Sequence, residues 1–482
     1  MGALSQTVPR RLIFNSTAIF GGEAVARLAT FLMAVVIAHR FGSAALGEYG
    51  FALAFASVLL LVPDFGLHLF ATRELAAEPA RLRTIFWSIH WLKLFLLGGV
   101  VAFTFCFGEW GVKSGATRIL IYLLTARVLL QTFSQASMSV FKAFEQMHYV
   151  AMQQLLNSAL VIVWVGLALA FHADLAVVVL ALVVGQAAET LLGWRIIQTK
   201  FSPSRPSGWD RKLLTGIMLA SFPIGITAIL QALNLRIDIL VLSRYVPKAL
   251  LGQFQAAAWF AVAAFLVTSL LMTVVFPKIA RLLRTPSPRG DSYVKSLLKN
   301  GFLLFAMASL MVWLCAPSLL RFCFGAQLTP AAGVLRIFVP IIPLVFLNTV
   351  LFYVFVAAGR RAVYLGALSF GVLAGIALQF GLAPHYGPAG SALADLIREF
   401  LVSTIYLYFL VRERQAPAVG SALLKVFMGA TALLAVIAYG ATSTHYSNQW
   451  PAAWMLLVFA GTLLFLGFPR RWEWRLLTDD SL

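Results

Sequence analysis

The sequence reads Arg40-Phe41-Gly42 and then Leu46-Gly47-Glu48-Tyr49 where one long apolar segment ends and the next begins. About 205 residues later it reads Arg244-Tyr245-Val246 and then Leu251-Gly252-Gln253-Phe254, again between two apolar segments. Similarity at a fixed offset indicates one structural unit used twice. In a membrane, a doubled helical bundle is the usual architecture of a transporter, with the substrate held between the two halves.

The composition requires lipid as the solvent for most of the chain. Of the 482 residues, 61% are hydrophobic and 11% are charged, and the mean hydropathy is +0.89. A soluble protein of this length could not bury so much apolar surface. The net charge of +19 does not indicate nucleic-acid binding, because the basic residues form short clusters between apolar runs rather than a basic domain.

Apolar windows of about 20 residues, the length that crosses the hydrocarbon core, can be placed about 14 times. The fold class is therefore an all-α polytopic membrane protein. The first apolar run is too long for a signal-peptide core and is interpreted as a membrane helix. The predicted spans are 12–38, 45–68, 84–107, 117–140, 148–171, 174–198, 213–243, 250–276, 297–318, 331–357, 361–383, 388–411, 420–440 and 450–468.

The basic residues predict the orientation. With both termini in the cytoplasm, 25 of the 37 Lys and Arg residues fall in cytoplasmic segments and six fall outside, as the positive-inside rule requires. The two six-helix repeats then start on the same side, so the repeat is parallel. The predicted domains are an N-terminal lobe 1–199, a cytoplasmic linker 200–212, a C-terminal lobe 213–415, and two additional helices with a cytoplasmic tail in 416–482.

Charged residues at membrane depth are the candidate functional residues, because each needs a partner or water there. The basic ones are Arg27, Lys93, Arg127, Arg236, Arg336 and Arg398. The acidic ones are Glu23, Glu189, Asp238, Asp395 and Glu399, with Asp64 near one end. Polar stripes at helical spacing run along spans 12–38, 117–140, 213–243 and 388–411, which indicates a shared polar interior.

These charges predict a cationic cavity accessible to water. The candidate substrate ligands are Arg27, Arg127, Arg236, Arg336 and Arg398, which suit an anionic head group such as a phosphate or diphosphate. The acids expected to couple transport to a proton or sodium gradient are Glu23, Asp238 and Glu399.

Simpler explanations stand beside these functional ones. Glu23 and Arg27 are four residues apart, and Asp395, Arg398 and Glu399 have helical spacing, so local ion pairs explain them equally well. Lys93 lies near the start of its span and is expected to extend its amine to the interface. Asp64 is expected to be an interfacial residue at a helix end. Pro63, Pro223, Pro340 and Pro343 are expected to kink or end helices.

No cofactor or metal site is expected. Three cysteines and seven histidines are scattered without ligand spacing. A Gly-Lys dipeptide is missing from the sequence, so the chain contains no P-loop of its own.

The chain resembles a known family in segments spread along most of its length. They are 38–42 with 46–49, 64–67 with Arg73-Glu74, Asp238 with 252–254, Phe276-Pro277, and 387–392. In their order and spacing the chain is similar to the polysaccharide, or O-antigen-type, flippases (the oligosaccharide flippase family) of the multidrug/oligosaccharidyl-lipid/polysaccharide exporter (MOP) superfamily.

The resemblance implies a flippase for exopolysaccharide or O-antigen biosynthesis that works by alternating access. Its substrate would be an isoprenoid-diphosphate-linked oligosaccharide, moved to the outer leaflet of a bacterial inner membrane. It implies a cavity between the two six-helix halves, with Glu23, Arg27 and Asp238 on the cavity-lining first and seventh helices. Besides the lipid-linked oligosaccharide and membrane lipids, other polysaccharide-assembly proteins of the membrane are candidate partners, and nucleic acid is not.

Three alternatives remain. A multidrug or small-solute antiporter of the same superfamily would be expected to have an acidic interior, whereas this one is basic. The major facilitator fold carries a Gly-Asp-Arg type pattern in the loop that here reads 72–78. A membrane polymerase or ligase of the same pathway needs a large outside loop, and the outside loops here are short, so the chain is not expected to be an enzyme.

Overall fold

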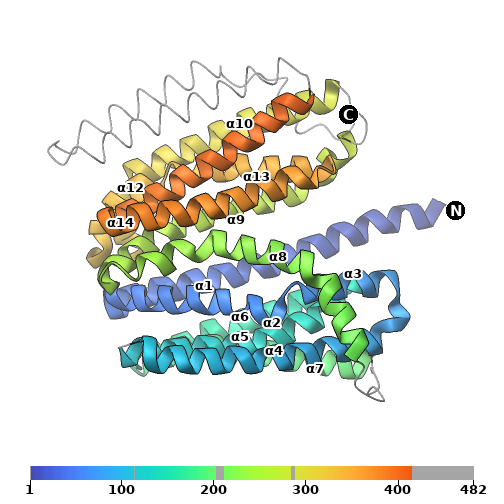
Figure 1. Cartoon of the computed structure of the whole chain (residues 1–482), viewed down its shortest axis with the longest axis horizontal. Coiled ribbons are helices and arrows are strands. Elements are labelled where there is room, and N and C mark those ends of the chain that lie inside the picture. Colours follow the sequence, from blue (N-terminus) through green and yellow to red (C-terminus); the bar gives the residue numbers. More distant parts are fainter. Residues whose placement is uncertain (1, 113, 202–210, 284–287, 415–482) are drawn as a thin grey trace. The chain divides into compact units, whose positions relative to one another are not determined.

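The computed structural model describes residues 2–112, 114–201, 211–283 and 288–414, and every regular element in these ranges is a helix (Figure 1). Among these residues, nine helices are long and apolar enough to cross a membrane, or ten if one bent pair counts as a single span. The chain is thus an all-α polytopic membrane protein. The predicted spans 420–440 and 450–468 lie outside the described residues, as does most of the predicted linker 200–212.

By their contacts, the residues separate into two compact units, Met1–Leu240 and Val241–Leu482. The first contains α1 (Gly2–Leu59), α2 (Leu61–Asp64), α3 (Leu67–Ala77), η1 (Pro79–Arg81), α4 (Leu82–Gly111), α5 (Gly115–Ala143), α6 (Met147–Ala170), α7 (Leu175–Ile196), η2 (Ile197–Phe201) and nearly all of α8 (Arg211–Leu242). The second contains α9 (Lys248–Leu282), α10 (Pro288–Leu314), α11 (Ala316–Phe324), η3 (Ala326–Ala331), α12 (Ala332–Phe338), α13 (Ile341–Ala357) and α14 (Arg361–Arg414).

Two of these helices each combine two predicted spans across a glycine. In α1 the backbone leaves the helical region at Gly42, with φ of 83°, and in α14 it does so at Gly387, with φ of 55°. Glycine adopts positive φ without the steric cost that a Cβ imposes. The repeat motif therefore begins at a kink in its first copy and at a turn between α8 and α9 in its second.

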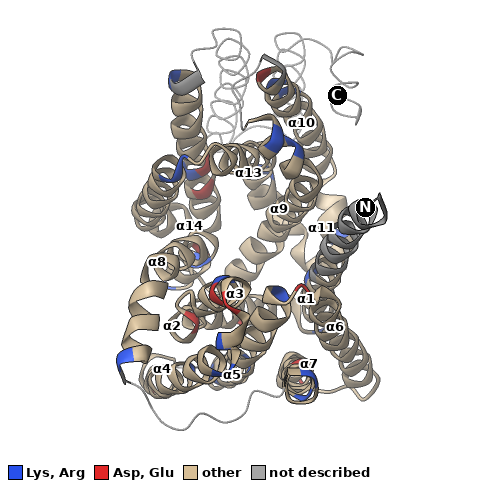
Figure 2. Ribbon diagram, turned by 90° about the vertical axis from the view of Figure 1, so that its right-hand side faces the viewer, with Lys and Arg blue, Asp and Glu red and all other residues tan. Residues whose placement is uncertain are grey.

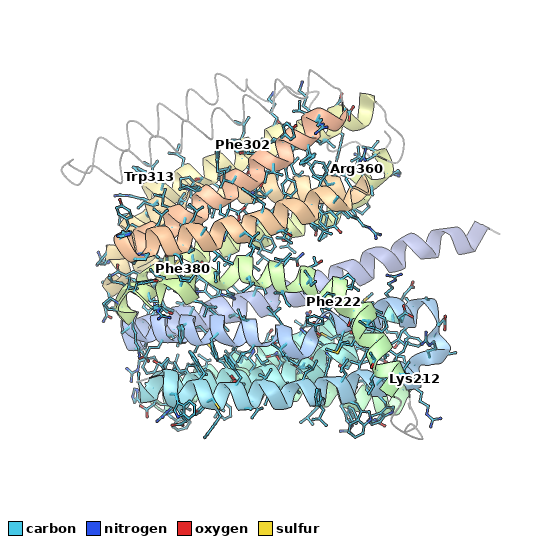
Figure 3. The ribbon with its side chains drawn as sticks, viewed as in Figure 1. Lys212, Phe222, Phe302, Trp313, Arg360 and Phe380 are labelled. Carbon is cyan, nitrogen blue, oxygen red and sulfur yellow. The ribbon has the colours of Figure 1, made fainter. Side chains whose placement is uncertain are left out.

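Proline accounts for two further changes of direction, as the sequence predicts. Helix α8 bends along its course (Figure 1), and Figure 3 places Phe222, the residue before Pro223, at this bend. Helices α12 and α13 meet at 49°, with Pro340 in the break. Each proline removes a backbone donor and its ring displaces the preceding turn.

A central helix organises each unit. Helix α5 packs against α1, α4 and α7 in the first unit, and α13 packs against α9, α10 and α14 in the second. Charged residues occupy a small part of the ribbon in both (Figure 2). Large apolar side chains such as Phe95 and Phe105 of α4 are more than half exposed. These exposed apolar faces suit contact with lipid chains.

The bend of α8 lies directly against the turn between α2 and α3. Gly66 of the turn has φ of 76°, and a Cβ there would lie 2.7 Å from the backbone nitrogen of Gly225. A Cβ on Gly225 would lie 2.8 Å from the carbonyl oxygen of Phe65. The rings of Phe65 and Phe222 are 5.7 Å apart beside this contact. Two glycines thus let the backbones touch.

Candidate functional site

Three of the five predicted arginines belong to one electrostatic cluster in the first unit. Arg27 lies on α1, Arg127 on α5 and Arg236 on α8, and each is half-buried. The charges of Arg27, Arg127 and Asp238 act on the Arg236 guanidinium, and those of Arg127 and Arg236 act on the Tyr49 phenol. We call Arg27, Arg127, Arg236 and Tyr49 the basic cluster.

Two buried donors of the basic cluster lack an acceptor. Tyr49 is fully buried, and neither its Oη nor Arg127 Nε has a hydrogen-bond partner in the described part of the chain. Leaving a buried donor unsatisfied costs about 1–3 kcal/mol, and more for a charged group. A planar guanidinium presents donors that match the oxygens of a phosphate or carboxylate. The arrangement is therefore suited to an anion.

Asp238, one of the predicted coupling acids, is the acid that acts on this cluster. Its side chain is buried and its Oδ1 accepts a hydrogen bond of 2.7 Å from the Ile239 backbone N–H. Its charge acts on Arg236, two residues earlier on α8. In the described part of the chain, the charges that act on Arg236 are those of one carboxylate, Asp238, and two guanidinium groups, Arg27 and Arg127. The side chain of Glu23 lies outside the described residues, so its pairing with Arg27 stays a prediction.

The other two predicted arginines lie in the second unit and have partners there. The Arg336 guanidinium is 5.0 Å from the centre of the Trp313 ring, a cation–π contact. Trp313 can be followed on α10 in Figure 3. Arg398 Nη1 is 2.9 Å from Asp395 Oδ1, and its Nη2 is 3.1 Å from Glu399 Oε1. This geometry favours the local ion pairs over a ligand role for Arg398.

Glu399, a further predicted coupling acid, is part of this buried network. Asn348 Nδ2 donates to its Oε2 at 2.7 Å and to its backbone oxygen at 3.0 Å. Ser403 Oγ donates to Asn348 Oδ1 at 2.8 Å. Glu399 is therefore held by an arginine and an amide.

The expectation for Lys93 was wrong. Lys93 lies on α4, and its side chain is fully buried in the protein instead of reaching the interface. Its Nζ is 3.2 Å from Asp64 Oδ1. It also donates to the carbonyl oxygen of Thr132 at 2.8 Å. Asp64 ends α2 as expected, is buried, and is also bonded to His68. The partners are 29 residues apart, and sequence spacing does not indicate such a pair.

Tyr49 was not predicted as a site residue, although the repeat contained a signal. It occupies the position of Phe254 in the second copy of the motif, and both side chains are fully buried. A hydroxyl in only one of two equivalent buried positions indicates a local polar role.

The fold defines the class of protein. An inward-closed structure of the lipid II flippase MurJ is similar with a TM-score of 0.70 and 18% identity, covering 94% of this chain and 98% of that chain. An inward-facing multidrug transporter of the MATE family is similar with a TM-score of 0.61 and 16% identity, covering 87% of this chain and 96% of that chain. A MOP-superfamily transporter from Pyrococcus furiosus is similar with a TM-score of 0.59 and 15% identity, covering 84% of this chain and 96% of that chain. The chain has the fold of the MOP superfamily.

Sequence comparison identifies the family. The model of the polysaccharide biosynthesis protein family matches residues 12–283, more than half of the chain, and the chain belongs to this family. The matched range contains the whole basic cluster. A search of curated protein sequences gave no match. The chain thus belongs to the polysaccharide biosynthesis protein family and has the fold of MOP-superfamily transporters.

Proposed function

We propose that the chain is a flippase that moves isoprenoid-diphosphate-linked oligosaccharide units across the bacterial inner membrane for cell-surface polysaccharide biosynthesis. The observation that carries the proposal is the basic cluster. Its three guanidinium groups and two unsatisfied buried donors suit a substrate with several negative charges close together.

A diphosphate supplies the acceptors that the cluster lacks. Its oxygens accept from Tyr49 Oη and from Arg127, while its charge offsets the mutual repulsion of the arginines. A hydrogen bond to a charged group contributes about 1.5–3 kcal/mol, net of the water contacts that it replaces. Each arginine that contacts the diphosphate then contributes about 10- to 150-fold in affinity.

Alternating access supplies the mechanism that we propose for the movement. The head group enters the polar interior from the cytoplasmic leaflet, is held by the cluster while the protein changes conformation, and leaves toward the outer leaflet. The isoprenoid chain stays in lipid, which removes the cost of transferring it to water. The lipid II flippase, a protein of the same fold, is named for flipping a lipid, which supports this proposal.

The test compares two arginines of the same helix. Purified protein is reconstituted in proteoliposomes with a fluorescent isoprenoid-diphosphate oligosaccharide, and movement between leaflets is followed by quenching of the outer leaflet. Arg127→Gln removes a cluster guanidinium. Arg118→Gln is the matched control, because Arg118 is exposed and paired with Glu109 at 2.8 Å.

We expect Arg127→Gln to weaken binding and so to lower transport about 10- to 150-fold at substrate concentrations below saturation, and Arg118→Gln to leave transport unchanged. Equal transport by both variants would remove Arg127 from the site. If wild type moves none of several lipid-linked sugars under an imposed ion gradient, the flippase proposal fails. Export of a drug or small solute by the same liposomes would then favour the antiporter alternative.

A further inference from the structure

Two glutamine side chains of the first unit lie near the middle of long apolar helices. Gln131 lies on α5 and is half-buried, and Gln231 lies on α8 and is exposed. Gln131 is 12 residues from the end of α5 and Gln231 is 11 residues from the end of α8, or about 16–18 Å at the helical rise. Because the hydrocarbon core is about 30 Å thick, this distance places both amides close to its centre.

The amides of Gln131 and Gln231 have no hydrogen-bond partner among the residues that the structure describes. Other amides of this unit are bonded: Gln153 Nε2 donates to the backbone oxygen of Glu189 at 2.9 Å, and Asn157 Nδ2 donates to its Oε2 at 2.5 Å. An amide that is left unpaired in hydrocarbon is costly, because it has two donors and an acceptor to satisfy. Gln131 and Gln231 therefore need water or a polar ligand.

Each of these amides shares a helix face with a charged residue of the candidate site. Gln131 follows Arg127 by four residues, on the same face of α5 and about 6 Å along it. Gln231 precedes Asp238 by seven residues, about two turns, and so lies on the same face of α8. The charge of Asp238 acts on Arg236 of the basic cluster. Both amides are thus within two helical turns of the charges that are proposed to hold the diphosphate.

The two amides also lie on the same side of the basic cluster. The last turns of α5 and the first turns of α8 meet in one buried apolar cluster, which includes Phe141 and Leu214. Since the arginines of the two helices also act on each other, α5 and α8 run past the basic cluster in opposite directions. Gln131 comes after the arginine of α5, and Gln231 comes before the arginine of α8. Both amides therefore lie toward the end where these helices meet.

We infer that Gln131 and Gln231 bind the sugar that is linked directly to the diphosphate, and this inference rests on the proposed function. A sugar hydroxyl or acetamido group both donates and accepts hydrogen bonds, as a primary amide does. A guanidinium group only donates, and it matches the oxygens of the diphosphate instead. The arginines and the amides therefore suit the two parts of one head group, a charged part and a neutral part beside it.

The amides make the first sugar a determinant of specificity. A site that hydrogen-bonds a substrate group discriminates against a substrate that lacks it, because the polar atoms of the site are then left unpaired. The basic cluster alone offers no such discrimination, since every diphosphate-linked substrate carries the same charged group. Recognition of the sugar is therefore separable from binding of the diphosphate.

The experiment measures these two contributions separately. Purified protein in lipid nanodiscs is titrated with a labelled isoprenoid diphosphate, and with the same lipid carrying one hexose: glucose, galactose or an N-acetylated form of either. The ratio of the two affinities reports the contribution of the sugar. Gln131→Met and Gln231→Met keep an unbranched side chain of similar length and remove the amide. Gln198→Met is the matched control, because Gln198 is exposed on η2, outside the basic cluster.

We expect wild type to bind at least one hexose-bearing lipid more tightly than the bare lipid. Each amide variant should lower this ratio about 2- to 13-fold, the effect of one lost neutral hydrogen bond. Affinity for the bare lipid should stay at the wild-type value, and Gln198→Met should change neither measurement. The inference is overturned if the ratio survives both substitutions, or if they weaken binding of both lipids equally, since that would be a loss of arginine geometry.

The results also distinguish the sugar contact from the proposed transport. Binding of all the lipids by wild type without any preference overturns the sugar contact and leaves the diphosphate site standing. A preference that depends on the amides, without transport in proteoliposomes, supports the sugar contact and rejects the flippase. If wild type binds neither the bare lipid nor any hexose-bearing lipid, both proposals fail.

Discussion

Replacing Lys93 by Met tests whether the buried pair with Asp64 holds α4 in place. The substitution keeps an unbranched side chain of similar length and removes the charge. Asp64 would remain buried with only His68 beside it, and the carbonyl oxygen of Thr132 would lose a donor. Breaking a buried ion pair by removing one partner costs about 3–5 kcal/mol, because an uncompensated charge stays behind.

An exposed pair in the same unit provides the reference. Arg118 and Glu109 are closer, at 2.8 Å, but their side chains are 37% and 40% exposed, against 0% and 10% for Lys93 and Asp64. Surface pairs contribute about 0–1 kcal/mol because water already solvates both ions. The burial of the ion pair, and not the distance between its atoms, should therefore determine how much free energy of unfolding Lys93→Met and Arg118→Met each lose.

The assay is reversible unfolding in mixed micelles, read as a free energy relative to wild type. We expect Lys93→Met to lose about 3–5 kcal/mol and Arg118→Met less than about 1 kcal/mol. Asp64→Asn removes the charge that Lys93→Met leaves without its partner. The double variant should therefore lose about 1–3 kcal/mol less free energy of unfolding than the two single variants lose in sum. A loss below about 1 kcal/mol for Lys93→Met would refute the reasoning.

Two further predictions concern packing and thiol chemistry. Gly225→Ala places a Cβ 2.8 Å from the carbonyl oxygen of Phe65 and should destabilise the protein by about 1–3 kcal/mol. Gly216→Ala on the same helix meets nothing within 4 Å and should be neutral or slightly stabilising in the same unfolding assay; equal effects would contradict the contact. Burial raises the pKa of the Cys323 thiol, so less thiolate is present at neutral pH and alkylation should be slow and keep rising above about pH 8.5. Maleimide labelling of single-cysteine variants checks this, with exposed Cys315 as the access control, and a rate that is already half-maximal at or below about pH 8.5 would show that the pKa of the Cys323 thiol is not raised.

The sequence was sufficient for features that depend on local pattern. Apolar length predicted the helical spans, and Pro223 and Pro340 predicted the bends that the structure shows. The spacing of Asp395, Arg398 and Glu399 left local ion pairs and a ligand role for Arg398 equally open, and the structure shows the ion pairs.

Contacts between helices could not be predicted in this way. Lys93 was expected at the interface because its position in the chain resembled that of a residue at a helix start. Its partner is set by how α2 and α4 pack, which hydropathy does not encode. The basic cluster was predicted as a set of arginines, but only the packing of α1, α5 and α8 separated Arg27, Arg127 and Arg236 from Arg336 and Arg398.

The position of α8 has a consequence for dividing the chain. According to the sequence repeat, α8 is the first helix of the second half. In the structure, however, Leu214 and Ile217 of α8 pack into a buried cluster with residues of α3 and α4. Gly225 of the same helix touches the α2–α3 turn. The contact boundary falls between Leu240 and Val241. Two separately expressed fragments should therefore be split in the turn after Leu242. A split at the polar linker 200–212 follows the repeat, but it would separate α8 from the helices that shield it.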